Sequence, residues 1–248
     1  MNSGLADAYR EDLAYIHDVG FDRYVLQSIP EILTILKSVQ VPGDWVLDLG
    51  CGSGLSTQAL VAAGYKVMGV DISAAMIAIA RQRVPQATFK VDSLFKVELR
   101  PCRAAIAIGE CLNYCFDPDN DAQTLQDFFR RVYAALCAEG FLIFDLLEAN
   151  PPAETQPVQG FREGEDWLVL FEKIQNQAQT LLKRRIITFR QVGEAYRRDE
   201  EIHYQRLYPS SAIKDWLAAV GFVVTLADSY GTFQLPPHHR AFIARKPA

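Results

Sequence analysis

Three alternating glycines, in the run Gly50-Cys51-Gly52-Ser53-Gly54, restrict the fold of this chain more than any other feature. The run follows the apolar segment Trp45-Val46-Leu47, which has the character of a short buried strand, and precedes a predicted helix over 53–63. Glycine adopts backbone conformations that side chains forbid, and the first turn of a helix presents free N–H groups. The pattern therefore predicts a strand, a ligand-binding loop and a helix.

The same alternation of strand and helix continues along the chain. Further strands are expected over 65–70, 88–91, 104–108 and 141–146, and further helices over 73–83 and over 125–136, the latter closed by Gly140. An additional helix over 21–39, kinked at Pro30, precedes the first strand. Such alternation predicts an α/β fold with a doubly wound, mostly parallel sheet that carries helices on both faces.

The rhythm changes after Asn150-Pro151-Pro152. Three stretches, 167–175, 181–191 and 195–208, predict a small antiparallel β insertion, and a helix over 210–220 and strands over 222–227 and 241–244 follow it. We expect one domain over 1–248, because an α/β domain with an insertion accommodates this length. Its expected parts are an N-terminal lid or helix region (1–40), a cofactor-binding core (44–146), the insertion (159–208) and a C-terminal helix with the final strands (209–248).

Composition and charge exclude several classes of function. Half of the residues are hydrophobic and the net charge is −5, which is ordinary for a globular protein and argues against nucleic acid as a partner. A basic stretch around Arg184 and Arg198 is interleaved with acidic residues, so we expect a solvated face there. The five cysteines form no C-x-x-C pair, which predicts reduced thiols and no metal site. We find no leader and no membrane span and expect a cytoplasmic protein.

Asp71 ends the second predicted strand about 20 residues after the glycine loop, where a carboxylate accepts the hydroxyls of a ribose. Together the loop and Asp71 predict a ligand that contains adenosine. The dinucleotide fingerprint G-x-G-x-x-G requires glycine at the position of Leu55, and the chain has no Tyr-x-x-x-Lys pair. An NAD(P)-dependent Rossmann oxidoreductase is therefore the alternative and not the favoured interpretation.

The segment Asp48-Leu49-Gly50-Cys51-Gly52-Ser53-Gly54 resembles the first motif of class I S-adenosylmethionine-dependent methyltransferases, and Gly-Val-Asp-Ile-Ser-x-x-Met at 69–76 strengthens the resemblance. The resemblance implies a Rossmann-like fold, S-adenosyl-L-methionine as cofactor and S-adenosyl-L-homocysteine as product. It also implies that Asp71 binds the ribose and Asp92 the adenine amine. The other positions expected around the cofactor are Asp48, Gly50, Cys51, Gly52, Gly54, Ile72, Met76, Ser93, Leu94 and Gly109.

Asp48 and the glycine run each have a competing structural interpretation. Asp48 is expected near the amino group of the cofactor, yet a carboxylate at a strand end also serves to tie down the following loop. Ser93 and Leu94 are expected to flank the adenine. The glycine run alone is a weak motif, because tight packing of a strand against a helix also requires glycine. Its position between a predicted strand and a predicted helix makes the glycine run a more specific signal of a ligand-binding loop.

Catalytic residues are harder to identify than cofactor residues, since in-line transfer from an activated methyl donor requires mainly alignment. Glu110, after the fourth strand, is a candidate proton acceptor or a turn cap. His17 is a candidate if the N-terminal segment folds over the donor, and His203 is another if the insertion faces the acceptor. Each histidine has a purely structural alternative. Candidate residues on the acceptor side are Asn113, Tyr114 and Tyr204.

The acceptor itself is expected to be a small molecule with an N or O nucleophile. Asn150-Pro151-Pro152-Ala153 resembles a motif of enzymes that methylate amino groups in nucleic acids, but it follows the fifth strand and ends in alanine in place of an aromatic ring. The insertion resembles that of small-molecule methyltransferases and is expected to roof the acceptor site, outside the donor site. A non-catalytic cofactor-binding subunit is a further alternative, and a monomer or homodimer is expected.

Overall fold

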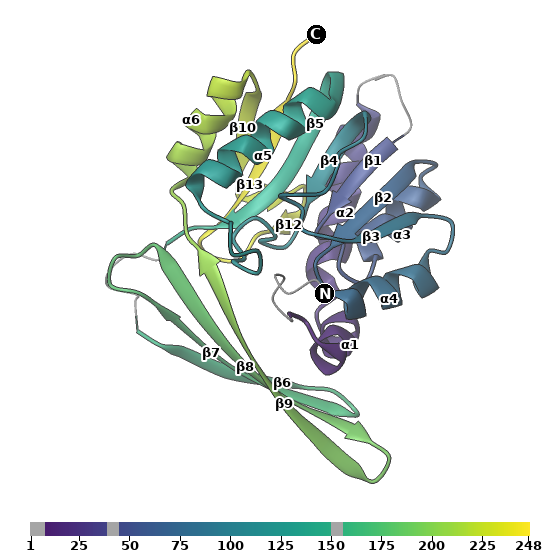
Figure 1. Ribbon diagram of the computed structural model, residues 1–248, viewed down its shortest axis with the longest axis vertical. Helices are drawn as coiled ribbons and strands as arrows, with labels where there is room; N and C mark the ends of the chain where they lie inside the picture. Colours follow the sequence, from purple (N-terminus) through teal and green to yellow (C-terminus); the bar gives the residue numbers. More distant parts are fainter. Residues whose placement is uncertain (1–7, 39–44, 150–155) are drawn as a thin grey trace.

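The computed structural model describes residues 8–38, 45–149 and 156–248 (Figure 1). A seven-stranded sheet has the order β10-β13-β5-β4-β1-β2-β3, with β1 to β5 parallel and β13 antiparallel to both of its neighbours. Its strands are β1 (Trp45–Leu49), β2 (Lys66–Asp71), β3 (Thr88–Val91), β4 (Cys102–Ala107), β5 (Leu136–Leu147), β10 (Val223–Ala227) and β13 (His239–Arg245). The predicted doubly wound fold is confirmed.

Helices cover both faces of this sheet because its strands are apolar on both sides. The helices are α1 (Glu11–Gly20), α2 (Arg23–Lys37), α3 (Leu55–Ala62), α4 (Ala74–Arg83), α5 (Ala122–Ala135) and α6 (Ser210–Val220). Leu47 of β1 packs with Phe128 of α5 and Leu217 of α6, whereas Val46 packs with Ile32 of α2 on the opposite face. Adjacent residues of one buried strand thus serve two separate cores.

Sequence analysis missed one helix and misplaced one helix end. The helix expected over 21–39 corresponds to α2, which begins two residues later, at Arg23, whereas α1 was not predicted. Gly140 was expected to end the helix that begins near residue 125. Instead α5 ends at Ala135, the next residue is already extended, and Gly140 lies inside β5. A Cβ atom at Gly140 would lie 2.7 Å from the carbonyl oxygen of Arg103, so close packing of the backbone requires this glycine.

The insertion is a four-stranded antiparallel sheet that projects beyond the carboxyl ends of the parallel strands, with α1 beside it (Figure 1). Its strands are β6 (Val158–Glu163), β7 (Trp167–Gln175), β8 (Leu181–Val192) and β9 (Ala195–Arg206). Sequence analysis predicted three of them and missed β6, whose side chains are mostly exposed and show no apolar alternation. Short strands β11 (Ser229–Tyr230) and β12 (Phe233–Gln234) were also missed.

The insertion packs against the N-terminal helix. Leu13 and Ile16 of α1 form a buried cluster with Trp167, Val169 and Ile186 of the insertion. Gly20 lies so close to Trp167 that a Cβ atom there would be 2.5 Å from the indole ring. Two other aromatic residues of the insertion, Phe161 and Tyr196, are exposed. Among the described residues, no helix is long and apolar enough to cross a membrane.

Candidate active site

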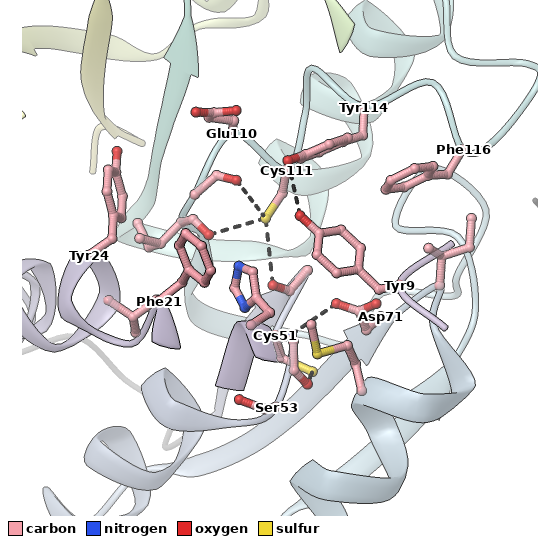
Figure 2. Close-up of a pocket in the computed structure, with 18 of the residues that line it drawn as sticks. Tyr9, Phe21, Tyr24, Cys51, Ser53, Asp71, Glu110, Cys111, Tyr114 and Phe116 are labelled. Carbon is pink, nitrogen blue, oxygen red and sulfur yellow. Dashed lines mark hydrogen bonds between the residues drawn. The ribbon is translucent and has the colours of Figure 1, made fainter. Parts of the chain in front are cut away.

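One cavity of about 460 Å³ lies beyond the carboxyl ends of the parallel strands, where doubly wound folds bind their ligands. The glycine loop and the ends of β2 and β4 form one side of it. The helix α1 and the insertion sheet form the other side. Figure 2 shows Asp71 and Cys51 on the first side, with Tyr9 and Tyr114 above them. The fold therefore brings residues from widely separated parts of the chain to one cavity.

The glycine loop has the geometry that its sequence predicts. Gly50, Gly52 and Gly54 all have positive φ, at 80°, 52° and 83°. A Cβ atom at Gly50 would lie 2.4 Å from the sulfur of Cys111, which packs beneath the loop. Since L-residues rarely adopt this φ and the space is closed, only glycine fits at position 50. The backbone of the loop therefore forms part of the cavity wall.

Asp71 holds this loop from the end of β2. Its two carboxylate oxygens accept hydrogen bonds from the backbone N–H groups of Gly52 and Ser73, each at 2.9 Å. Burial raises the pKa of Asp71, although the backbone N–H bonds act in the opposite direction. The carboxylate lines the cavity and each oxygen retains lone-pair capacity. Asp71 is thus placed to accept further hydrogen bonds from a ligand.

Asp48 lies behind the loop and does not line the cavity. It is 1% exposed, and one of its oxygens accepts hydrogen bonds from the hydroxyls of Ser56 and Thr57, both at 2.6 Å. Burial raises the pKa of Asp48 to about 6. These contacts favour the anchoring interpretation over direct contact with a cofactor amine. Gly54 also lies outside the cavity lining, where it begins α3 and packs tightly against Ala80.

The remaining positions expected around the cofactor line the cavity. Ser73 caps α4 by accepting a hydrogen bond from the N–H of Met76, which brings the methionine to the cavity. Asp92 accepts a hydrogen bond from the N–H of Ser93 at 2.8 Å and stays partly exposed to the cavity. The lining residues from the predicted set are Gly50, Cys51, Gly52, Asp71, Ile72, Met76, Asp92, Ser93, Leu94 and Gly109.

The segment 9–18, which we call the latch, closes the cavity. Glu201 of β9 accepts hydrogen bonds from the backbone N–H groups of Tyr9 and Arg10, both at 2.8 Å. On the opposite side, the hydroxyl of Ser73 donates to the carbonyl oxygen of Tyr9 at 2.8 Å. The phenol of Tyr9 lies 3.1 Å from that of Tyr114 (Figure 2). The latch therefore connects the insertion to the core.

Ion pairs fix the rest of the latch. Arg190 and Arg197 of the insertion contact Asp12, which is buried. Burial acts to raise the pKa of Asp12, but the two guanidinium groups outweigh it and lower the pKa. Arg83 of the core pairs with Asp18 at 2.8 Å. The insertion therefore holds the latch in place and lines the same cavity as the glycine loop.

His17 lies on the cavity side of α1, as the lid hypothesis requires. Its ring stacks on Phe21 and meets the edge of Tyr9. Burial lowers the pKa of His17 to about 4, so the imidazole is neutral at neutral pH. A neutral imidazole has one nitrogen with a free lone pair, and no hydrogen bond occupies either ring nitrogen within the described ranges. His17 is thus available to accept a proton or a hydrogen bond.

Glu110 lines the cavity but is fully engaged. One oxygen lies 2.6 Å from His239 Nε2, and the other accepts hydrogen bonds from Arg184, at 3.1 Å, and from Gln205. Burial tends to raise the pKa of Glu110, but Arg184 and His239 outweigh it and hold the pKa well below the usual range. A carboxylate with so low a pKa is a poor base. These contacts favour a role in holding Arg184 and His239 over the expected proton-accepting role.

Three other candidates lie away from the cavity. Asn113 is buried and its amide bonds the backbone of Leu147 and Arg206, so it joins two segments of the chain. His203 is 2% exposed, contacts Glu201 at 2.8 Å and packs behind the aromatic rings. Tyr204, the next residue of β9, faces outward and is 43% exposed. The expected acceptor roles of these three residues are not supported, whereas Tyr114 does line the cavity.

Sequence reasoning missed several cavity residues. Tyr9, Tyr24 and Phe116 come from segments without a motif, so no local pattern identifies them. Arg184 was interpreted as part of a solvated basic face. In the structure Arg184 and Arg190 point inward from β8, whereas Arg185 points outward. The period-two alternation of a strand distinguishes these positions, and it could have been applied to the basic stretch.

Comparisons with known proteins agree with this site. Residues 46–140 match the family model of the methyltransferase domain. YqeM of Bacillus subtilis (strain 168), whose name assigns it to the methyltransferases without a substrate, is 26% identical over 223 residues, 88% of this chain and 85% of that protein. The match to the family model includes the glycine loop, Asp71 and Asp92, since all of them lie within 46–140.

Solved structures have the same fold. An S-adenosylmethionine-dependent methyltransferase from Clostridium acetobutylicum ATCC 824 superposes with a TM-score of 0.79 at 18% identity, covering 95% of this chain and 98% of that one. The sugar N-methyltransferase KedS8 from Streptoalloteichus sp ATCC 53650 has a TM-score of 0.76 at 18% identity, covering 100% of this chain and 96% of that one.

A doubly wound sheet with a glycine loop after β1 and a carboxylate at the end of β2 defines a Rossmann-like protein that binds an adenosine-containing ligand. Residues 46–140 match a methyltransferase domain, and the protein is an S-adenosylmethionine-dependent methyltransferase whose cofactor is S-adenosyl-L-methionine. The cavity fits this cofactor, because the backbone at Gly52 is not covered by a side chain and Asp71 presents a carboxylate.

Proposed function

We propose that this enzyme methylates a nitrogen or oxygen atom of a small-molecule acceptor. The observation that carries the proposal is the shared cavity, in which donor-loop residues, insertion residues and the latch line about 460 Å³. That volume is within the range of small-molecule pockets, about 300–1,000 Å³. A macromolecular acceptor would have to displace the latch. The fold shared with the sugar N-methyltransferase KedS8 supports a small acceptor.

Within this proposal the residues of the donor side bind and orient the cofactor. Asp71 would accept the ribose hydroxyls, and Asp92, with Ser93 and Leu94, would surround the adenine. Bound S-adenosylmethionine supplies a methyl group that is already activated by the sulfonium. The chain therefore needs to align the acceptor with the methyl carbon and to exclude water, and the latch and the neighbouring Phe21 are placed on the cavity wall to do so.

His17 is the group that we propose to receive a proton when the acceptor arrives protonated. It lies on the cavity wall, is neutral at neutral pH and has a free ring nitrogen within the described ranges. Glu110 is proposed as a positioning residue that acts through Arg184 and His239. Localisation in the cytoplasm and a monomeric or homodimeric state remain part of the proposal.

The proposal is tested with methyl-labelled S-adenosylmethionine and three sets of acceptors: small amines, small hydroxyl compounds and structured RNA. We expect label transfer to a small compound and none to RNA. His17→Asn should lower the turnover number on that acceptor by about 10²-fold or more while the affinity for S-adenosylhomocysteine changes little. Transfer to RNA alone would refute the small-molecule assignment, and unchanged turnover of His17→Asn would refute the role of His17.

A further inference from the structure

The part of the cavity formed by the insertion contains more cationic than anionic groups. Lys173 of β7, Arg184 of β8 and Arg162 of β6 all line it. Glu110 is the carboxylate nearest to this group and pairs with Arg184 at 3.1 Å. The carboxylates of Asp71 and Asp92 are at the ends of β2 and β3, on the donor side. Lys173 and Arg162 are therefore left without a balancing carboxylate among the described residues.

The register of the insertion places two of these cations directly opposite each other. Lys173 and Arg184 are paired across β7 and β8, on the face that also carries Phe171 and Ile186. Like charges directly opposite each other in an antiparallel pair are destabilising. Burial, together with the nearby guanidinium groups of Arg184 and Arg162, lowers the pKa of Lys173. An anion between the two side chains would remove this repulsion.

Part of the hydrogen-bonding capacity of the cations is also unused, although Arg184 donates to Tyr114 and Glu110. The buried Nε of Arg184 has no hydrogen-bond partner, and Lys173 Nζ has neither a hydrogen bond nor an ion pair within the described part of the chain. Arg162 lies over the ring of Phe21, with its Cζ 4.9 Å from the ring centroid, at the edge of the same cavity. Buried donors normally have acceptors, and guanidinium and ammonium groups bind carboxylate and phosphate oxygens well.

We propose that the methyl acceptor carries an anionic group, a carboxylate or a phosphate, that Lys173, Arg184 and Arg162 bind on the insertion side of the cavity. This inference rests on the proposed function, since it assigns the acceptor to this part of the cavity. The three side chains come from three adjacent strands, so they surround the anion from one sheet face. The anion holds the acceptor against the insertion and directs its nucleophile toward the donor side.

The test uses the protein saturated with S-adenosylhomocysteine and calorimetric titration with succinate, inorganic phosphate or the neutral succinamide. We expect succinate or phosphate to bind and succinamide not to bind. The anion that binds more tightly shows whether the acceptor carries a carboxylate or a phosphate. Lys173→Gln should weaken that binding by about tenfold or more, the loss expected for a hydrogen bond to a charged group. Lys173→Arg should restore most of it.

Lys183→Gln is the matched control, because Lys183 precedes Arg184 in β8 and so projects from the opposite face of the same sheet. It should bind the anion like the wild type. Equal binding of succinamide and the anions would overturn the inference. A loss of S-adenosylhomocysteine affinity in Lys173→Gln would also overturn it, because it would assign the cations to the carboxylate of the donor. Methyl transfer to uncharged small acceptors alone would overturn it and leave the proposed function intact.

Discussion

Carboxylates in this protein have different roles because their surroundings differ. Asp48 lies in β1, Asp71 ends β2 and Glu110 follows β4. Asp48 binds two hydroxyls, Asp71 binds two backbone N–H groups and Glu110 binds cationic partners. Only the last two line the cavity. At the scale of single residues, the identity of the hydrogen-bond donors thus distinguishes a loop anchor from a ligand group and from an electrostatic support.

Asp71→Ala should weaken the binding of S-adenosylhomocysteine by about 1.5–3 kcal/mol, the range for a lost hydrogen bond to a charged group. The reason is that Asp71 both presents a carboxylate to the cavity and holds the N–H of Gly52. Isothermal titration calorimetry measures the effect. Asp127→Ala, an exposed carboxylate on α5, is the control and should bind normally. Wild-type affinity in Asp71→Ala would show that the ribose assignment is incorrect.

The pair of Glu110 and His239 should make stability depend on pH. Burial alone lowers the pKa of His239, but the bond to Glu110 and its charge outweigh burial and raise the pKa above 6.5. A histidine whose pKa is higher in the folded state than in the unfolded state stabilises the fold. This stabilisation is fully present below the pKa of the unfolded state, about 6.5, and is lost as the pH rises through the pKa of the folded state. The stability advantage of the wild type over Glu110→Gln should therefore shrink as the pH rises through that window.

Denaturant unfolding at several pH values between 5 and 9 measures this difference. NMR titration of Glu110→Gln should show a lower pKa of His239 than in the wild type, because burial then acts without the Glu110 carboxylate. The pH dependence of the stability difference between the proteins with and without Glu110→Gln should vanish when both carry the His239→Gln substitution. A His239 pKa that is unchanged by Glu110→Gln would contradict the pairing.

Between elements, the latch is the connection on which the site depends. Glu201 of β9 holds its backbone from one side, and Ser73 at the start of α4 holds it from the other. Sequence analysis treated the insertion as a roof for the acceptor alone. Because β9 positions Tyr9 over the donor side, removal of the insertion should impair donor binding as well.

Glu201→Gln should speed the dissociation of S-adenosylhomocysteine several-fold. The amide of glutamine offers one acceptor oxygen, so one of the two buried N–H groups of Tyr9 and Arg10 loses its partner, at a cost of about 1–3 kcal/mol to the closed latch. Stopped-flow kinetics measures the rate. The control is Glu200→Gln, because Glu200 pairs with Arg185 and Arg198 on the outer face. Equal dissociation rates in the two variants would argue against the latch.

At the scale of the whole molecule, the donor cavity lies between two separately built units. The seven-stranded sheet has its own cores on both faces, and the insertion with α1 has a smaller one around Trp167. The latch and the cavity lining join these units. A ligand that contacts both units should therefore couple their stabilities.

We expect S-adenosylhomocysteine to slow amide hydrogen exchange in the core loop 50–54, in the latch and in β9 together. A ligand at 100 times its Kd stabilises the state that it binds by about 2.7 kcal/mol, and opening of the latch exposes the ligand, so all three segments share that protection. Exchange measured by mass spectrometry tests this, with α6 as the internal control because it does not line the cavity. Protection confined to 50–54 would contradict the coupling.

The sequence alone determined the doubly wound core, the glycine loop and the position of Asp71. These features follow from local rules: the period of apolar residues selects strand or helix, and positive φ in a tight loop selects glycine. The parallel arrangement then brings the ends of β1, β2 and β4 to one edge without further information.

The tertiary structure alone decided which polar residues face the cavity. His17 and His203 are equally plausible in the sequence, yet one lines the cavity and the other packs behind aromatic rings. Tyr9 meets Glu201 across 192 positions of the chain, and Arg184 meets Glu110 across 74. Such pairings depend on how separate elements dock against each other. No local propensity contains that information, because a side chain's partners are set by packing over the whole chain.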